Sequence, residues 1–526
     1  MNRRRSSEDE PTPVRLPSLT SLAITIGVGL LAFGVYLWQL TVPGFVAAYD
    51  SGVYVAASIH FVTGVLPYKD FTFVNPPGIV LLMVPVGVIS RIFGSHDGFI
   101  AARVLSSFVT ALNAGLLAWI VRRRGRLAMV VAGVGLALLP IAFFVSSALK
   151  LDPYCVCFVL LGVSVMYYHD QGLGQLSTRR LVLGGLLFGL AAVVKLWAFF
   201  PFLALVICLM VRHRRRVIVF AAAAAGGFVV PALPFFVLAP RSFISQIFTV
   251  QLFQKANPGD SPSVIWRLTD LTGFLRTSVS PTGAEAVVAF SVLLLVVAIA
   301  FARRVEHEGV DAFLLIAAAI TVCGLLAAPA SATYYGYFAA PFLVGVLAVS
   351  LARIGELTRG VVVHVRVSSF IRRLVFSLLV ASGSLFIFAL TLYTTTFYTR
   401  YAQFFGLYSP YLAPVNEVIP PGSCVVYDYV IDGVDSNRLQ SSVPNCPSVV
   451  DPYGMWQEWG NHLKPPAPTF VAEWRSYFQS AQYVVLSFPH TPYIPWNKSL
   501  TLWFAKNYHL IHASDHVFIY AKVASD

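Results

Sequence analysis

Long apolar runs constrain the fold of this chain more than any other feature. Residues 20–41, 99–121 and 217–238 are each almost entirely apolar, and about 20 such residues are needed for a helix to cross a bilayer. Hydrophobic residues make up 57% of the 526 residues and charged residues only 12%, whereas about a quarter of the residues of a soluble domain are charged. The sequence therefore predicts an α-helical polytopic membrane protein, with the lipid bilayer as a partner.

Short basic clusters between the apolar runs indicate the orientation. The formal net charge is +13, and its basic residues gather at 122–126, 212–216, 303–304 and 372–373. Clusters that alternate with spans are typical of cytoplasmic loops, whereas a nucleic-acid surface would need a continuous basic face. We therefore expect no nucleic-acid partner and place these four clusters in the cytoplasm.

A topology that keeps every basic cluster inside has about eleven spans. It begins with a cytoplasmic tail (1–19), continues as a transmembrane domain (20–397) with outer loops at 42–98 and 239–284, and ends in an extracytoplasmic domain (398–526). The expected spans are 20–41, 99–121, 127–147, 152–168, 180–194, 196–211, 217–238, 285–302, 310–328, 335–352 and 374–397. We place this multi-pass protein in the cell (plasma) membrane.

Two segments decide whether the number of spans is odd or even, and therefore on which side of the membrane the later loops lie. Residues 76–94 resemble a span, but a crossing there would move the first basic cluster outside, so we expect this segment to lie in or dip into the outer leaflet. Residues 181–211 carry basic residues at both ends and Lys195 inside. Two short helices with Lys195 at the outer turn keep both basic ends in the cytoplasm.

The C-terminal region has the character of a small α/β domain. Residues 423–429, 482–488 and 516–523 are rich in β-branched and aromatic residues, which favours strands. Cys424 and Cys446 lie in this polar region, where an oxidising compartment would permit a disulfide. Five of the nine tryptophans also lie here. Their rings suit either sugar contact or core packing, and Trp456 and Trp459 are weak candidates for acceptor binding.

Ionisable residues gather at the expected outer ends of the spans. Charges near membrane depth are costly and are usually functional, which favours a role for those within or next to spans: Asp50, Arg103, Asp152 and Lys195. Lys69, Asp260 and Asp270 are more typical of solvated loop residues. Carboxylates beside cations suit acid–base chemistry on a substrate that carries a phosphate.

The order of these motifs resembles the GT-C superfamily of membrane glycosyltransferases, in particular the protein O-mannosyltransferases and the bacterial lipid A aminoarabinose transferases. The resemblance rests on "YDSGVYVAAS", "PYKDFTFVNPPG", "KLDPYCVCFVLLGVSVMYY", "GLAAVVKLWAFFPFLALV" and "YFAAPFLVGVLA", which follow one another between residue 42 and about residue 350. It implies a polyprenyl-phosphate sugar donor, a glycan, lipid or protein acceptor of the bacterial cell envelope, and an inverting transfer of a hexose or pentose.

The resemblance also implies roles for individual residues. Asp50 matches the catalytic base, and Arg103 and Lys195 match the cations near the donor phosphate. Substrate contacts are expected from Tyr54, Asp70, Asn75, Asp152 and Tyr335. Several bacterial members have lysine at the position of Asn75, so Lys69 or Lys255 would replace it in phosphate binding. No metal ligands are predicted and no cofactor is certain, although a divalent cation is left open.

Two other functions compete with glycosyl transfer. A transporter or flippase for lipid-linked sugars should gather its charges near the bilayer midplane, and here they lie at the outer rim. A polymer ligase that uses a lipid-diphosphate donor would need a large outer loop between late spans, whereas the largest expected outer regions lie at the start and the end of this chain.

Overall fold

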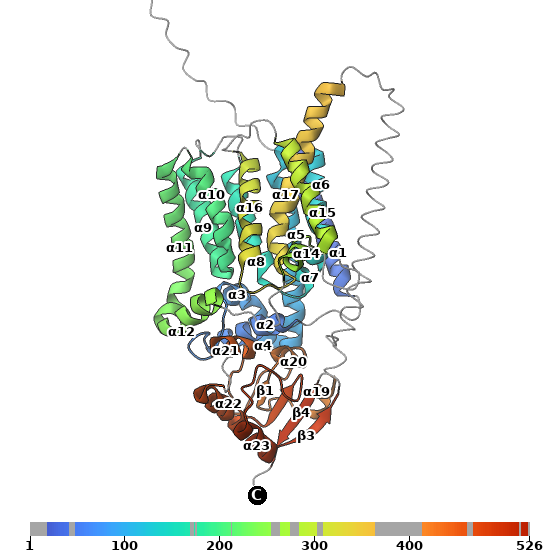
Figure 1. Cartoon of the computed structure of the whole chain (residues 1–526). Coiled ribbons are helices and arrows are strands. Elements are labelled where there is room, and N and C mark those ends of the chain that lie inside the picture. Colours follow the sequence, from blue (N-terminus) through green and yellow to red (C-terminus); the bar gives the residue numbers. More distant parts are fainter. Residues whose placement is uncertain are drawn as a thin grey trace, which may run out of the picture.

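A bundle of membrane-length helices stands on a small α/β domain (Figure 1). The computed structural model describes residues 18–41, 48–168, 173, 176–211, 213–253, 263–273, 283–301, 309–362, 413–459, 466–514 and 517–523. The expected span at 374–397 and the candidate residue Lys255 lie outside these ranges.

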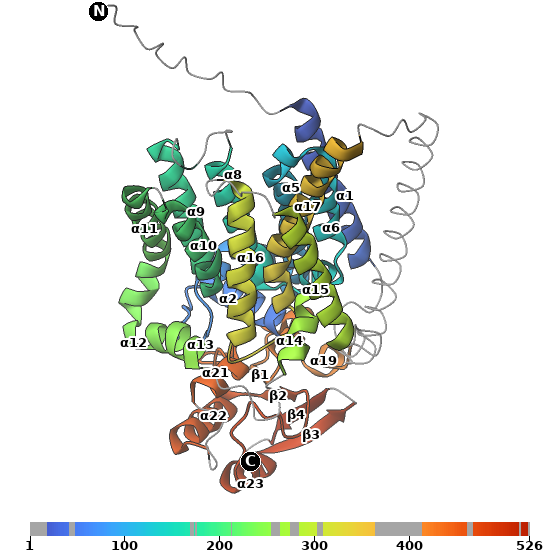
Figure 2. The same ribbon diagram turned by 45° about the horizontal axis from the view of Figure 1, so that its top comes forward.

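The expected spans within the described residues correspond to helices, which confirms the α-helical polytopic architecture. Six of these helices are long and apolar enough to cross a membrane alone, and the bent pair α6–α7 makes a seventh candidate. The bundle helices are α1 (Leu19–Leu40), α5 (Ser95–Ile120), α6 (Arg126–Leu138), α7 (Pro140–Ser147), α8 (Leu151–Met166), α9 (Thr178–Val194), α10 (Phe199–Met210), α11 (Arg214–Leu238), α15 (Gly283–Ala300), α16 (Val310–Ala327) and α17 (Tyr335–Val362). Figure 2 shows α9, α10 and α11 on one side of the bundle and α1, α6, α15 and α17 on the other.

The bundle contains two interruptions, of which the sequence predicted only the one at Lys195, since 127–147 was expected as a single span. Pro140 begins α7 after Leu139 adopts an extended conformation, and the axes of α6 and α7 differ by 58°. Lys195 is also extended (φ −152°, ψ 127°) between α9 and the short helix η3 (Leu196–Ala198). Lys195 lies at the end of the bundle that faces the C-terminal domain, so the chain turns there, as the two-helix interpretation of 181–211 requires.

Three short helices lie between the bundle and the C-terminal domain: α2 (Tyr49–Val62), α3 (Gly78–Leu82) and α4 (Val84–Phe93) (Figure 1). The segment at 76–94 is thus divided into two helices at Met83, and the ten residues of α4 extend only about 15 Å at 1.5 Å per residue. Residues 51–59 of α2 are all buried, because α3, α4, α5 and α20 of the C-terminal domain pack against this helix.

The C-terminal domain contains a mixed four-stranded sheet of order β1-β2-β4-β3. Its strands are β1 (Val425–Tyr427), β2 (Tyr483–Leu486), β3 (Tyr508–Ala513) and β4 (Phe518–Lys522), and its helices are α19 (Ala413–Val418), α20 (Val430–Asp435), α21 (Pro452–Glu458), α22 (Pro468–Ser480) and α23 (Lys498–Asn507). β1 and β2 are parallel, and β4 pairs antiparallel with both β2 and β3. The three predicted strand segments contain β1, β2 and β4, whereas β3 was not predicted, because its exposed residues do not alternate in polarity.

Aromatic packing and one disulfide hold the C-terminal domain together. Trp474 is fully buried and packs against Phe478, while Trp496 and Trp503 border the same core. Cys424 and Cys446 form a disulfide. Most tryptophans of this domain therefore have a packing role.

Close backbone contact attaches the C-terminal domain to the bundle. A Cβ atom added to Gly52 of α2 would lie 2.5 Å from the backbone nitrogen of Ile431 in α20. At the start of α5, Ser95 Oγ donates to the carbonyl of Val434 (2.6 Å), and the backbone N–H of His96 donates to Asn437 Oδ1 (2.9 Å). The C-terminal domain is thus packed directly on the helix that begins with Tyr49 and Asp50.

Gly52→Ala should weaken this contact, because the new methyl group meets backbone atoms of Ile431 that have little freedom to move. Overpacking of this kind costs about 1–3 kcal/mol. Thermal unfolding of purified protein in detergent measures the effect. Gly34→Ala in α1 is the matched control, because its added Cβ meets nothing within 4 Å. Equal unfolding temperatures for the two variants would contradict the prediction.

Candidate active site

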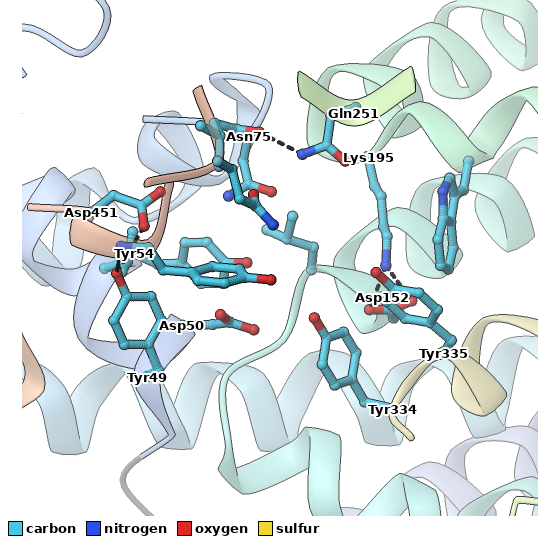
Figure 3. Close-up of a pocket in the computed structure, with 16 residues that line it drawn as sticks. Tyr49, Asp50, Tyr54, Asn75, Asp152, Lys195, Gln251, Tyr334, Tyr335 and Asp451 are labelled. Carbon is cyan, nitrogen blue, oxygen red and sulfur yellow. Dashed lines mark hydrogen bonds and ion pairs between the residues drawn. The ribbon is translucent and has the colours of Figure 1, made fainter. Parts of the chain in front are cut away.

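A cavity lies where α2, α8, α17 and the C-terminal domain meet (Figure 3). Its empty volume is about 630 Å³, including the part open to solvent. It is lined by Tyr49, Asp50, Val53, Tyr54, Val74, Asn75, Leu151, Asp152, Lys195, Trp197, Gln251, Tyr334, Tyr335, Asp451, Tyr453 and Gln457. Carboxylates, one ammonium group, amides and aromatic rings therefore share one space at the end of a membrane bundle.

Asp50 is the second residue of α2, and its carboxylate is paired with Lys150. The ammonium nitrogen lies 2.6 Å from Asp50 Oδ2, and the side chains of Lys150 and Asp50 are 6% and 25% exposed. Within the described part of the chain, Asp50 Oδ1 has no hydrogen-bond partner. The position in the first turn of α2 also favours a negative charge, because the helix dipole is positive there. Asp50 is thus an ion-paired carboxylate with one oxygen left for a substrate.

The chain between α7 and α8 has a local conformation that brings Lys150 to this acid. Leu149 adopts a positive φ of 41°, which is uncommon for a residue other than glycine. Ser51 Oγ, next to Asp50, donates to the carbonyl of Ala148 (2.5 Å) and so fastens α2 to the same turn.

Asp152 and Lys195 form a second ion pair at the far end of the cavity. Lys195 Nζ lies 2.8 Å and 3.0 Å from the two carboxylate oxygens of Asp152. The Asp152 side chain is fully buried and that of Lys195 is 12% exposed. Lys195 Nζ also lies 3.8 Å from the ring centre of Trp197 and 4.7 Å from that of Tyr335, which is cation–π geometry. Both oxygens of Asp152 are thus engaged, whereas the ammonium group of Lys195 borders the cavity.

The C-terminal domain supplies the wall at the opposite end. Tyr49 Oη donates to Asp451 Oδ1 (3.0 Å) and accepts from the backbone N–H of Tyr453 (2.7 Å). Asp451 also caps α21 by accepting from the N–H of Gly454 (2.9 Å). Burial raises the pKa of the Asp451 carboxyl to about 6, even though these hydrogen bonds lower it.

The first loop and the segment after α12 (Pro240–Ile244) close the remaining side. Gln251 Nε2 donates to the carbonyl of Val74 (2.6 Å), and Tyr68 Oη donates to the carbonyl of Asn75 (2.5 Å). These two bonds fix the backbone just before the proline pair, so that Asn75 borders the cavity (Figure 3).

The structure brings together about half of the residues that the sequence singles out. The cavity is lined by six of them: Asp50, Tyr54, Asn75, Asp152, Lys195 and Tyr335. Arg103, Lys69, Asp70, Trp456 and Trp459 are not among its lining residues.

The residues outside the cavity have other contacts. The guanidinium group of Arg103 lies 5.7 Å from the ring centre of Phe99. Lys69 Nζ lies 3.9 Å from Asp70 Oδ1 at the surface, where the lysine side chain is 52% exposed. Asp70 Oδ2 accepts from the N–H of Leu66 (2.8 Å), which closes a turn of the loop.

The two candidate tryptophans lie behind the wall of the cavity. Trp456 stacks on Tyr453 (ring centres 5.5 Å apart), and Trp459 stacks on Phe470 (5.7 Å) within the domain core. Both indole rings thus pack within the C-terminal domain, and their role in acceptor binding stays a prediction.

The sequence did not assign roles to several residues of the site. Lys150 carried a signal, because it stands two residues before Asp152 at the same expected turn. Gln251, Tyr334, Asp451 and Tyr453 carried none, because their place depends on which distant segments pack together. Among the described residues, no group of three His, Cys, Asp or Glu side chains is arranged to hold a metal ion.

Comparison with known proteins identifies the fold. Residues 73–329 match the model of glycosyltransferase family 87. ArnT from Cupriavidus metallidurans bound to undecaprenyl phosphate has a similar structure, with a TM-score of 0.59 and 17% identity over 97% of this chain and 99% of ArnT. The apo state of ArnT matches with a TM-score of 0.60 and 16% identity, over 95% of this chain and 98% of ArnT. The apo form of the Archaeoglobus fulgidus oligosaccharyltransferase matches with a TM-score of 0.50 and 14% identity, over 88% of this chain and 69% of the oligosaccharyltransferase.

Among curated proteins, none has a sequence that matches the chain. The resemblance to membrane glycosyltransferases of the GT-C superfamily is nevertheless confirmed, and the likeness to ArnT extends over the C-terminal domain as well as the bundle.

Lys195→Met should destabilise the protein by about 3–5 kcal/mol, because it leaves the buried Asp152 carboxylate without its counter-ion. Asp152→Asn combined with Lys195→Met should recover most of this loss, since neither member of this pair then carries a charge. Lys69→Met is the control, because an exposed pair such as Lys69–Asp70 contributes about 0–1 kcal/mol. Unfolding in detergent measures all three variants. If the double variant were as unstable as Lys195→Met, the loss of stability would not come from an unpaired Asp152 carboxylate.

Proposed function

We propose that this membrane protein transfers a sugar from a polyprenyl-phosphate donor to a hydroxyl group of an extracytoplasmic acceptor, with inversion at the anomeric carbon. The match to glycosyltransferase family 87 and the fold shared with ArnT support a lipid-linked sugar donor. The residues that surround the cavity support the chemistry.

The different environments of the two acids carry the proposal. Asp50 faces the cavity with an oxygen that is available to a substrate, while both oxygens of Asp152 are held by Lys195. A general base must be within hydrogen-bonding reach of the proton that it removes. Asp50 meets this requirement and Asp152 does not, so Asp50 is the proposed base and Asp152 positions Lys195.

A single displacement accounts for the reaction. The acceptor hydroxyl loses its proton to Asp50 as its oxygen attacks the anomeric carbon of the donor sugar. The bond between that carbon and the phosphate oxygen breaks, and its electron pair leaves with the polyprenyl phosphate. Because the new bond forms opposite the leaving group, the configuration at the anomeric carbon inverts.

Lys195 is the proposed partner of the donor phosphate. Its ammonium group borders the cavity and is held in place by Asp152, Trp197 and Tyr335. A cation at this position would stabilise the charge that develops on the leaving phosphate. Lys150 does not line the cavity but is a second cation next to it, 2.6 Å from Asp50 and 4.2 Å from the ring centre of Tyr334. It supplies positive charge to a site in which Asn75 stands at the position of the lysine of several bacterial members.

Charge distribution supports an extracytoplasmic site in the cell membrane. Arg122–Arg124 follow the end of α5, Arg216 lies in the first turn of α11, and Arg353 lies in the second half of α17; none of them lines the cavity. Arg216 donates to the carbonyls of Leu173 and Leu176, and Arg353 pairs with Asp311. A basic end is typical of the cytoplasmic side, and the Cys424–Cys446 disulfide suits an oxidising compartment.

The alternative of a transporter or flippase gains no support from this geometry. The cavity is lined by residues of α2 and α21, which lie at the end of the bundle beside the C-terminal sheet (Figure 1), whereas a transporter site is expected near the bilayer midplane.

Asp50→Asn should reduce sugar transfer by about 10²–10⁴-fold, the usual contribution of a general base. The reason is that an amide cannot take the proton from the attacking hydroxyl group. Consumption of purified polyprenyl-phosphate sugars, tested as a panel, measures the rate. Asp70→Asn is the matched control, because Asp70 lies outside the cavity and an amide oxygen can still accept from Leu66. Turnover of a folded Asp50→Asn variant within tenfold of the parent would remove Asp50 from the mechanism.

Lys195→Gln should raise the donor KM by about 10–100-fold, since a hydrogen bond to a charged group contributes about 1.5–3 kcal/mol. The acceptor KM should change far less. Lys69→Gln removes an equal charge outside the cavity and should leave both constants near the parent values. Steady-state kinetics with each substrate varied in turn make the test. An unchanged donor KM in Lys195→Gln would exclude this lysine from phosphate binding.

A further inference from the structure

The cavity has two chemically different ends, and the proposed donor contacts occupy only one of them. Figure 3 shows Lys195, Asp152 and Tyr335 at one end, Asp451 and Tyr49 at the other, and Asp50 between them. The second end is formed by α2 and by α21 of the C-terminal domain, which lies beyond the segment matched by the glycosyltransferase model. A ligand there would meet Asp50 from the side opposite the phosphate.

Tyr453 presents an aromatic ring to this end and is supported from behind. Its ring stacks on Trp456, with centres 5.5 Å apart, and meets Tyr493 edge-on at 5.3 Å. Neither supporting ring belongs to the lining of the cavity, whereas Tyr453 does. A rigidly supported aromatic face suits stacking against the C–H face of a sugar ring.

Polar groups beside this ring can both donate hydrogen bonds to hydroxyl groups and accept hydrogen bonds from them. Gln457 lines the same cavity and follows Tyr453 by one turn of α21. A carboxamide offers a donor and an acceptor on one side chain, and a hydroxyl both donates and accepts. The combination of ring, amide and phenol therefore matches a compact ligand with several hydroxyl groups.

A chain of hydrogen bonds fixes the position of Tyr453 and α21 relative to Asp50. The N–H of Tyr453 donates to Tyr49 Oη, and Tyr49 Oη donates to Asp451, which caps α21. Tyr49 directly precedes Asp50 in α2. Two segments about 400 residues apart in the sequence are thus fixed to one another next to the proposed base.

We infer that Tyr453 and Gln457 form the acceptor subsite, and that the acceptor group which binds there is a sugar ring of a glycan or glycolipid. The inference rests on the proposed function and names its second substrate class. A serine- or threonine-containing peptide is the competing class. Extended peptides commonly bind to a sheet edge, and no residue that lines this cavity belongs to one of the four strands of the C-terminal sheet.

Direct binding tests this subsite without any donor. Full-length protein in nanodiscs is mixed with methyl glycosides of common pyranoses and furanoses, or with serine-containing peptides, and saturation-transfer NMR records contact. At least one glycoside should give a signal that Tyr453→Ala removes and Tyr453→Phe retains, because phenylalanine keeps the ring. Phe488→Ala removes an exposed aromatic ring of the same domain outside the cavity and should leave the signal unchanged.

Kinetics give an independent readout once a consumed donor is known. Tyr453→Ala and Gln457→Ala should each raise the acceptor KM about tenfold, equivalent to about 1.4 kcal/mol, with less than a threefold change in donor KM. Binding of peptides but not glycosides, or unchanged binding and KM in both variants, would overturn the subsite. If glycosides bind through Tyr453 but no polyprenyl-phosphate sugar is consumed, the subsite stands and the proposed transferase activity fails.

Discussion

Charge compensation beside a membrane is the constraint on which the rest of this site depends. An unpaired charge removed from water is costly, and losing one partner of a buried pair costs about 3–5 kcal/mol. The structure answers with two lysine–aspartate pairs, Lys150–Asp50 and Lys195–Asp152. Each pair joins two different segments of the bundle, so pairing the charges also fixes α2 against the α7–α8 turn and α8 against the α9–α10 turn. Stability and site geometry therefore have the same origin.

The two pairs are alike in composition and unlike in surroundings, and this difference separates their proposed roles. Each acid is the second residue of its helix. Asp152 is fully buried with both oxygens on one ammonium group, whereas Asp50 is a quarter exposed and bonded through one oxygen. A carboxylate held on both oxygens is suited to orienting its lysine, and one with a single bond is suited to accepting a proton. Burial and ion pairing, rather than residue type, thus distinguish the roles proposed for the two acids.

Much of the architecture was predictable because it follows from local pattern. Apolar runs of span length mark the bundle helices, and the acids at helix starts mark one end of it. β3 escaped prediction because most of its residues are exposed without alternation. Arg103 was expected at the donor phosphate from the resemblance to the superfamily. Its guanidinium group lies by Phe99 of the same helix and does not line the cavity, so its part in donor binding stays a prediction. Asp451 and Tyr453 could not be predicted, because their place depends on how a domain about 400 residues away packs on α2.

The position of the cavity suits the two proposed substrates, which favour different media. A polyprenyl chain stays in the bilayer, so its phosphate can reach only the rim of the bundle, and Lys195 lies at that rim between α9 and α10. A hydroxyl-rich acceptor stays in water, so it can approach only through the C-terminal domain, whose α21 borders the same cavity. Asp50 lies between these two approaches because α2 is held on one side by Ser51 at the α7–α8 turn and on the other by Ile431 at Gly52. The buried helix α2 is therefore the element that would let the proposed membrane-bound donor and the proposed soluble acceptor meet at Asp50.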